Sequence, residues 1–497
     1  MLFNSPEFVF VFLPLVLAVY WLVLKGHRTI FCVLVLAAAS LFFYGHWNPK
    51  YLVLFLGSVG GNYLISRQIF AAHGARAKRW LLLAGIAFNL GLLGYFKYAG
   101  FVVENAASAF AQPWSIEPIL LPLAISFFTF QQIAYLVDCH KGEVAPPPIS
   151  KYLLFISFFP QLIAGPIVHH YEMLPQLDDL AQKRDRLLSF LVGATFFFAG
   201  LFKKVVLADG IGAYADPVFD GVANGAAVAA LEAWIATFAF GFQIYFDFSG
   251  YSDMAIGLAL LFGVRLPLNF NSPYKATSII DFWRRWHITL SRFLRDHLYI
   301  PLGGNRRGPG RQLGNIAIVM LLGGLWHGAG WGFVLWGGLH GAYLVINHLW
   351  RRLSPSWRLP GAVGGGTTFL AVMVAWVPFR AETWQATETI WRAMAGLSAM
   401  NAPSDAPGAA WFGMAHNPLW IHDPALALAA LALLSGFVWL LPNTQGWLPY
   451  AAGAGEKRWR AWRPSTYWAI FNGGIAVIAL AFMIGRPETQ EFLYFQF

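Results

Sequence analysis

The sequence predicts an all-α integral membrane protein, a multi-helix bundle of about 10 to 12 transmembrane helices. Hydrophobic residues make up 58% of the 497 residues and charged residues only 12%, whereas a soluble domain carries about a quarter charged residues. Apolar stretches recur at close to the roughly 17–25 residues that a helical crossing needs. The net charge of +10 lies mostly in loops, which indicates a membrane topology signal rather than nucleic-acid binding.

Ten apolar stretches are candidate transmembrane helices, although several are short. Two further regions are ambiguous: segment 151–168, and the pair 313–326 and 331–350. Each is either a full span or a re-entrant element folded back into the bundle. The ten candidate spans are residues 8–24, 30–46, 51–65, 80–97, 119–137, 187–207, 229–263, 367–379, 425–441 and 467–485.

The loops between these stretches alternate in charge. Seven loops hold 27 of the 34 Lys and Arg residues, and all seven share one side if both ambiguous regions return to the face they left. The positive-inside rule makes that side cytoplasmic, which gives ten crossings with both termini outside. The pair Lys203–Lys204 conflicts with this scheme. If 151–168 crosses fully and 229–263 splits at Gly250, that pair moves inside and twelve crossings result, so both versions stay open.

His327 lies in a Gly/Trp-rich break between the apolar stretches 313–326 and 331–350. A polar ring in hydrocarbon is costly unless it faces protein or a water-filled cavity, so an intramembrane histidine is a functional candidate. Its imidazole can take a proton from a hydroxyl nucleophile, since its ordinary pKa lies near neutral pH. The alternative is a histidine that hydrogen-bonds a neighbouring helix and only packs.

Loop 264–312 is the most basic of the loops, with nine Lys or Arg against Asp281 and Asp296. Within it, apolar residues of 279–300 recur mostly at three- and four-residue spacing, which predicts an amphipathic helix at the cytoplasmic interface. His287 lies in this helix, either as a functional residue or as an ordinary interfacial one. The arginines of this loop could bind phosphates of a donor molecule or anchor the chain at anionic headgroups.

Other polar residues within apolar stretches have several interpretations. We expect Asp247 and Asp253 to form salt bridges with the arginines of 284–295, although they could instead orient a catalytic group or line a polar path. The adjacent pair His169–His170 points in different directions on one helix, so it is not expected to bind a metal. His340 and His348 follow His327 without ligand spacing, and no metal site is predicted there either.

Several segments together resemble the membrane-bound O-acyltransferase superfamily, and most closely its bacterial alginate O-acetyltransferase branch. The resemblance covers about residues 1–350, is most specific in 240–345, and is mainly one of hydrophobicity and length beyond 350. The segments that carry it are Asp281-Phe282-Trp283-Arg284-Arg285-Trp286-His287, the following residues 288–296, Tyr299-Ile300-Pro301-Leu302-Gly303-Gly304-Asn305, Leu325-Trp326-His327-Gly328-Ala329, and the stretches 246–255, 268–274, 159–167 and 1–5.

The resemblance implies one membrane-bound O-acyltransferase domain over residues 1–497, with 264–312 as an interfacial cytoplasmic segment. Its fold would include re-entrant or broken helices around a central catalytic passage through the membrane. His327 would be the catalytic residue and His287 its companion. The residues expected to bind substrate are Trp326, Asn269, Arg284, Arg285, Arg295, Asp296, Asn305 and Asp247.

The sequence and the resemblance together give a functional hypothesis. The protein would pass an acetyl group from a cytosolic thioester, acetyl-CoA, to a hydroxyl acceptor for acetylation of an alginate-like exopolysaccharide. It would lie in a bacterial inner membrane and work with a periplasmic acetyltransferase partner or directly on polysaccharide, without a metal or tightly bound cofactor. His327 would be a general base, with an acyl-histidine intermediate as the weaker option. The alternatives are acyl or D-alanyl transfer to another cell-envelope polymer, and a proton-coupled transporter.

Overall fold

The computed structural model describes the chain except for residues 183–184, 355, 357–358, 398–423, 449, 451–461, 463, 487 and 494–497. The described residues form helices joined by loops and turns, and they contain no strand. They form two compact units, each assembled from separate parts of the sequence. The first unit is Met1–Ala199, Tyr251–Leu268 and Met483–Glu491, and the second is Gly200–Gly250, Asn269–Phe482 and Phe492–Phe497. The prediction of one functional domain over the whole chain stays a prediction.

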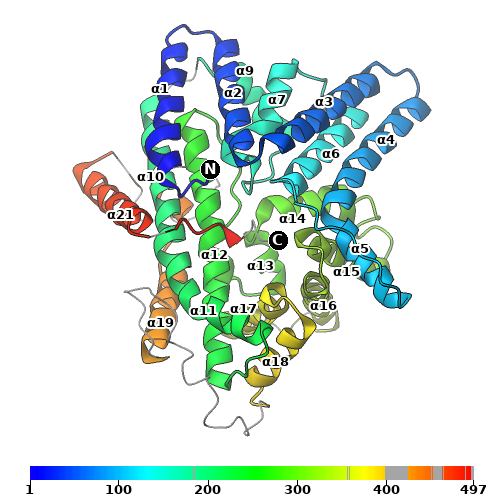
Figure 1. Cartoon of the computed structure of the whole chain (residues 1–497), viewed down its shortest axis with the longest axis vertical. Coiled ribbons are helices and arrows are strands. Elements are labelled where there is room, and N and C mark those ends of the chain that lie inside the picture. The colour runs from blue at the N-terminus through cyan, green and yellow to red at the C-terminus, as the bar shows by residue number, and fades with distance from the viewer. Residues whose placement is uncertain are drawn as a thin grey trace. The chain divides into compact units, whose positions relative to one another are not determined.

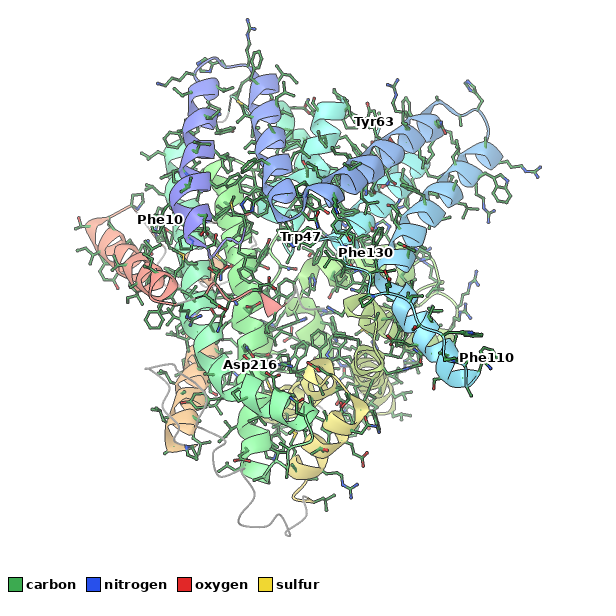
Figure 2. All side chains as sticks on the ribbon, viewed as in Figure 1. Phe10, Trp47, Tyr63, Phe110, Phe130 and Asp216 are labelled. Atoms are coloured by element: carbon green, nitrogen blue, oxygen red, sulfur yellow. The ribbon has the colours of Figure 1, made fainter. Side chains whose placement is uncertain are left out.

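The first unit is a bundle of N-terminal helices in which α1 and α2 lie side by side and α3 packs against α4 and α6 (Figure 1). Buried amides join α3 to α4, because Asn89 Nδ2 donates to Asn62 Oδ1 at 2.6 Å. Tyr63, labelled on α3 in Figure 2, donates its hydroxyl proton to the carbonyl oxygen of Pro147 at 3.1 Å. Its helices are η1 (Phe8–Phe12), α1 (Leu13–Leu24), α2 (Thr29–Trp47), α3 (Pro49–Ala71), α4 (Ala75–Leu93), η2 (Gly94–Tyr98), α5 (Ala99–Ala109), α6 (Ile125–Lys141), α7 (Ile149–Ser157), α8 (Phe159–Leu162) and α9 (His170–Asp178).

The second unit contains both histidine segments, 281–287 and 325–329. Asp216 on α11, labelled in Figure 2, accepts a hydrogen bond from Gln243 Nε2 of α12 at 3.2 Å and lies 3.4 Å from Arg380 Nη2 of α17. Helices α10 (Arg186–Phe202) and α12 (Ala230–Leu261) contribute residues to both units. The other elements are η3 (Lys203–Ala208), α11 (Asp209–Ala223), η4 (Pro273–Lys275), α13 (Ile279–Arg285), α14 (Ile288–Leu294), η5 (Arg295–Tyr299), α15 (Pro309–His327), α16 (Trp331–Leu353), α17 (Gly361–Arg380), α18 (Trp384–Met394), α19 (Pro424–Leu440), α20 (Thr444–Trp447) and α21 (Thr466–Ile484).

Most of the candidate spans are helices in the structure. Those long and apolar enough to cross a membrane are Thr29–Trp47, Ala75–Ala109, Arg186–Ala223, Gly361–Arg380 and Thr466–Ile484, with Phe8–Leu24 and Pro424–Leu440 as shorter apolar helices. The stretch predicted over 119–137 starts late, at Ile125, because Pro122 and the left-handed Ala124 (φ +63°) precede the helix. These helices support a multi-pass membrane protein.

The twelve-crossing version fails on both of its requirements. Segment 151–168 contains only α7, of nine residues, and α8, of four, which are too short to span a bilayer. Segment 229–263 does not split at Gly250, because α12 continues through it for 32 residues. Gly250 allows close packing instead, since a Cβ there would lie 2.8 Å from the Gly200 carbonyl oxygen. The ten-crossing version is therefore favoured.

Helices α15 and α16 lie side by side as a hairpin (Figure 1), with their backbones in contact. A Cβ at Gly324 would overlap the carbonyl oxygen of Phe333, and one at Gly337 would overlap that of Met320. Only glycine lets two helices approach this closely. The small residues of this region are thus required by helix packing.

Gly337→Ala should lower the thermal unfolding midpoint of the detergent-solubilised protein by several degrees, because the new methyl group forces α15 and α16 apart. Gly314→Ala on α15 is the matched control, since a Cβ at Gly314 meets nothing within 4 Å. Alanine favours a helix over glycine by about 1 kcal/mol, so this control should leave the midpoint unchanged or raise it. Equal midpoints for the two variants would contradict the packing argument.

Candidate active site

His327 lies at the C-terminal end of α15, where a glycine-rich turn leads into α16. Gly328 and Gly330 are extended, with φ of −160° and −165°, so the chain leaves the helix directly after the imidazole. The His327 side chain is buried, with 5% of the residue exposed. The predicted helix break at this histidine is confirmed.

His287 lies in a break between α13 and α14, so the predicted continuous helix over 279–300 is wrong. The backbone of His287 is left-handed, with φ +42° and ψ +55°, and Trp286 before it is extended. The cause is Asn269, whose Oδ1 accepts hydrogen bonds from the backbone N–H of Thr289 at 3.3 Å and from its hydroxyl at 2.9 Å. These side-chain bonds cap α14 in place of continued helical hydrogen bonds.

Asn269 also fixes the proton on His287. Its Oδ1 accepts from Thr289, so an oxygen faces His287 Nδ1, at 3.1 Å. An amide oxygen has no proton to give, hence Nδ1 carries the ring proton and Nε2 keeps its lone pair. Burial lowers the pKa of His287 from 6.5 to about 3, because the imidazolium would lose its hydration. At neutral pH, His287 is therefore an uncharged hydrogen-bond acceptor.

The structure brings the two histidines together, with 6.5 Å between their ring centroids. Trp326 lies beside both, 5.0 Å from the His327 ring and 6.2 Å from the His287 ring. Two of the residues expected to bind substrate, Trp326 and Asn269, are thus next to the histidines. Other aromatic rings enclose the pair: Phe248, 4.8 Å from His287, and Trp336 and Phe379, 5.0 and 5.4 Å from His327.

The sequence analysis gave His340 no role, yet this residue lies in the same aromatic cluster. It is fully buried on α16, its ring is 4.8 Å from Trp336, and its Nδ1 accepts a hydrogen bond from Trp283 Nε1 at 3.3 Å. The sequence does contain a signal for the contact between Trp336 and His340, because residues four apart share one face of a helix. Its contact with Trp283, 57 residues earlier, was not visible from spacing.

Asp247 does not pair with the arginines of 284–295, and that prediction is wrong. Its Oδ1 lies 2.8 Å from Lys204 Nζ, and the same ammonium lies 2.7 Å from Asp209 Oδ1, with all three side chains buried. The Leu493 N–H donates to Asp247 Oδ2 at 3.1 Å. Charges so deeply buried persist only when paired. Lys204 is one of the two lysines that conflicted with the ten-crossing scheme. Because its charge is paired inside the protein, Lys204 does not indicate which loops are cytoplasmic.

The basic candidates differ from the histidines in exposure. Arg285 Nε pairs with Asp281 at 2.9 Å, and Arg295 Nε pairs with its neighbour Asp296 at 2.7 Å, with 60% of the Arg295 side chain exposed. Arg284 and Asn305 are also exposed. Both expectations for these arginines, donor phosphates and lipid headgroups, stay predictions.

The remaining polar candidates lie in the first unit. Asp253 is buried there, and its predicted pairing with the arginines stays a prediction. His170 Nδ1 lies 3.0 Å from Asp138 Oδ2, so its partner is a carboxylate on α6. Over the described parts of the chain, no group of three or more His, Cys, Asp or Glu side chains is placed to hold a metal ion.

Protein stability should decrease below about pH 6.5 because His287 is buried in its neutral form. Its folded-state pKa of about 3 is lower than the unfolded value of 6.5. Its contribution is complete above the unfolded pKa and is lost as the pH falls toward 3, by at most about 1.4 kcal/mol per pH unit. Denaturant unfolding of wild type and His287→Gln between pH 7.5 and 4.5 measures this difference. Parallel pH dependences in the two proteins would rule it out.

Comparisons with known proteins show which family this chain resembles. Residues 140–377 match the membrane-bound O-acyltransferase family. The chain is 43% identical over 429 residues to a peptidoglycan O-acetyltransferase of Helicobacter pylori, and the match covers 81% of each chain. It is 42% identical over 405 residues to a probable alginate O-acetylase of Pseudomonas aeruginosa, covering 79% of this chain and 75% of that one. A teichoic acid D-alanyltransferase of Streptococcus thermophilus is 29% identical over 244 residues, which cover 46% of this chain and 57% of that one.

The similarity to the two O-acetyltransferases extends over most of the chain, and the family match includes both histidine segments. They confirm the resemblance on which the sequence analysis relied, and they set aside the transporter hypothesis. The chain belongs to the membrane-bound O-acyltransferase family and is a multi-pass membrane O-acyltransferase.

Proposed function

We propose that this enzyme passes an acetyl group from a cytosolic thioester, acetyl-CoA, to a hydroxyl group that serves cell-envelope polysaccharide acetylation. The observation that carries the proposal is the pair of buried imidazoles 6.5 Å apart, in a chain of this family. The relatives with about 40% identity are named for acetyl transfer to peptidoglycan or alginate. An alginate-like exopolysaccharide is the acceptor class we favour.

His327 acts as the general base in the proposed reaction. It takes the proton of the acceptor hydroxyl, whose oxygen attacks the thioester carbonyl carbon and forms a C–O bond. The resulting oxyanion collapses, the C–S bond breaks with its electron pair moving to sulfur, and the thiolate receives the proton from His327. Because the thioester supplies its own activation, the step needs no ATP. General acid–base catalysis of this kind contributes roughly 10²- to 10⁴-fold to a rate.

We assign His287 a different role, because its low pKa makes it a weak general base at neutral pH. Its Nε2 lone pair can instead accept a hydrogen bond from a second hydroxyl group of the acceptor molecule, which orients the reacting hydroxyl toward His327. Asn269 supports this role by holding the proton on Nδ1. His287 is thus proposed to position the acceptor.

The exposed arginines and the membrane setting complete the proposal. Arg284 and Arg295, with Arg285, would attract the phosphates of the donor at the cytoplasmic mouth of the site. The enzyme would lie in a bacterial inner membrane, and a periplasmic acetyltransferase partner or the polysaccharide itself would take the acetyl group. A second candidate, D-alanyl transfer, is favoured by the similarity to the D-alanyltransferase of Streptococcus thermophilus over about half of the chain.

His327→Ala should reduce acetyl transfer from ¹⁴C-acetyl-CoA by at least about 100-fold, because the general base is lost. The assay uses full-length protein in nanodiscs with an oligosaccharide acceptor, and liquid scintillation counts the labelled product. His73→Ala is the control, since His73 is exposed in the first unit. Wild-type activity in the His327 variant would refute the general-base role. Transfer only from a D-alanyl carrier-protein thioester would favour the second candidate.

Asn269→Leu should lower kcat by roughly 100-fold with little change in KM, since it frees the His287 ring to turn and to exchange its tautomer. Asn269→Asp should retain much of the activity, because a carboxylate oxygen still accepts from Nδ1. Steady-state kinetics of both variants, at matched thermal stability, tests this. Equal kcat values for the Leu and Asp variants would show that the proton on His287 does not matter.

A further inference from the structure

His340 is locked in the tautomer opposite to that of His287. The indole N–H of Trp283 points at its Nδ1, 3.3 Å away. An indole nitrogen is a donor and never an acceptor, so Nδ1 of His340 must be the atom with the lone pair. A neutral imidazole that accepts at Nδ1 carries its proton on Nε2. His340 therefore offers an N–H donor inside the protein, where none of its surface is exposed.

This N–H and the indole N–H of Trp336 are buried donors of one aromatic cluster, which also contains the indole rings of Trp326 and Trp376. Among the described residues, neither His340 Nε2 nor Trp336 Nε1 has a hydrogen-bond partner, and both atoms are sealed from the surface. The two rings are 4.8 Å apart, and the Trp336 ring is 5.0 Å from that of His327. Buried donors are almost always hydrogen-bonded in folded proteins, and unpaired ones recur at functional sites. Two such donors, on the ring next to His327 and on the ring beyond it, indicate a place for an acceptor oxygen.

We propose that Trp336 Nε1–H and His340 Nε2–H bind the carbonyl oxygen of the acyl group and stabilise the oxyanion that forms on it. This inference rests on the proposed function, and deepens it by assigning the second half of the reaction centre. As the acceptor oxygen attacks the carbonyl carbon, the C=O π electrons move onto that oxygen, and the two N–H groups face the new negative charge. When C–S cleaves, the charge leaves with the thiolate and the carbonyl re-forms.

The assignment fits how such charge is stabilised elsewhere in enzymes. Fixed donors in a site without water are most effective against a charge that exists only in the transition state. Both donors here are on α16, whose glycine contacts with α15 hold them relative to His327. The competing interpretation is that both N–H groups only point at neighbouring aromatic faces, a weak contact. Tyr343, 5.9 Å from the His340 ring and inclined to it by 70°, and Phe379, 5.3 Å from the Trp336 ring and inclined by 63°, are the neighbouring rings for such contacts.

Two substitutions of His340 separate the two interpretations. His340→Gln can place an amide N–H near the position of Nε2, whereas the shorter side chain of His340→Asn reaches only the position of Nδ1, where its oxygen can accept from Trp283. If Nε2–H stabilises the oxyanion, the Gln variant keeps kcat within about tenfold, and the Asn variant loses roughly 100-fold with KM little changed. If His340 merely accepts the Trp283 hydrogen bond, the Asn variant is the more active one. That order, or equal kcat values, would overturn the proposal.

Trp336→Phe tests the second donor, since it keeps an aromatic ring but removes the N–H. We expect kcat to fall by roughly 100-fold with KM little changed. The matched control is Trp391→Phe, which removes an indole N–H that donates to the Val374 carbonyl oxygen on α17 at 3.2 Å. It should retain wild-type kcat. Thermal unfolding of each variant shows which variants are folded. The kcat values of the folded Trp336 and His340 variants then test the proposed oxyanion contacts.

An infrared measurement makes this inference independent of turnover. In His327→Ala, which should bind but not transfer, a ¹³C=O acetyl thioester should show a carbonyl band at lower frequency than in solution. The band should return toward its solution position in His327→Ala/Trp336→Phe. Absence of acetyl-CoA turnover by wild type would refute the donor assignment of the proposed function alone. An unshifted band in His327→Ala, or one that the second substitution leaves unchanged, would overturn the oxyanion assignment.

Discussion

The contact between the backbones of α15 and α16 is the constraint on which the site depends. Gly324 and Gly337 leave no room for side chains where these helices meet. The last residue of α15, His327, is thereby held against Trp336 on α16. A wider hairpin would separate the base from the aromatic cluster while leaving each helix intact. The glycines are therefore as much a part of the proposed chemistry as the imidazole.

His287 and His340 are buried, so the position of each ring proton depends on the protein groups that face the two ring nitrogens. The segment 281–289 sets two of these positions. Through Trp283 it holds a lone pair on Nδ1 of His340, and through Thr289 it fixes the amide of Asn269 that faces His287. One imidazole consequently presents an acceptor at Nε2 and the other a donor. In the proposed reaction, the acceptor at His287 binds the acceptor molecule and the donor at His340 binds the acyl carbonyl.

The sequence predicted the helical membrane fold and the break at His327, because hydrophobic length and Gly/Trp punctuation are local signals. It missed the break at His287, since the side chain that causes it, Asn269, is 18 residues away. For the same reason, residue spacing in loop 264–312 predicted an amphipathic helix that a tertiary contact overrides. The buried partner of Asp247 was missed too, because Lys204 was interpreted as a topology signal rather than as one member of an ion pair.

In the proposed reaction, the acyl carbon lies between His327 on α15 and the two N–H donors on α16. The most direct measurement is a cryo-EM structure of the enzyme with a non-transferable acetyl-CoA analogue. We expect the carbonyl carbon to lie within about 4 Å of a His327 ring nitrogen. We expect the carbonyl oxygen to lie at hydrogen-bond distance from Trp336 Nε1 and His340 Nε2. An acyl group bound away from His327, with the aromatic cluster still closed around that ring, would contradict it.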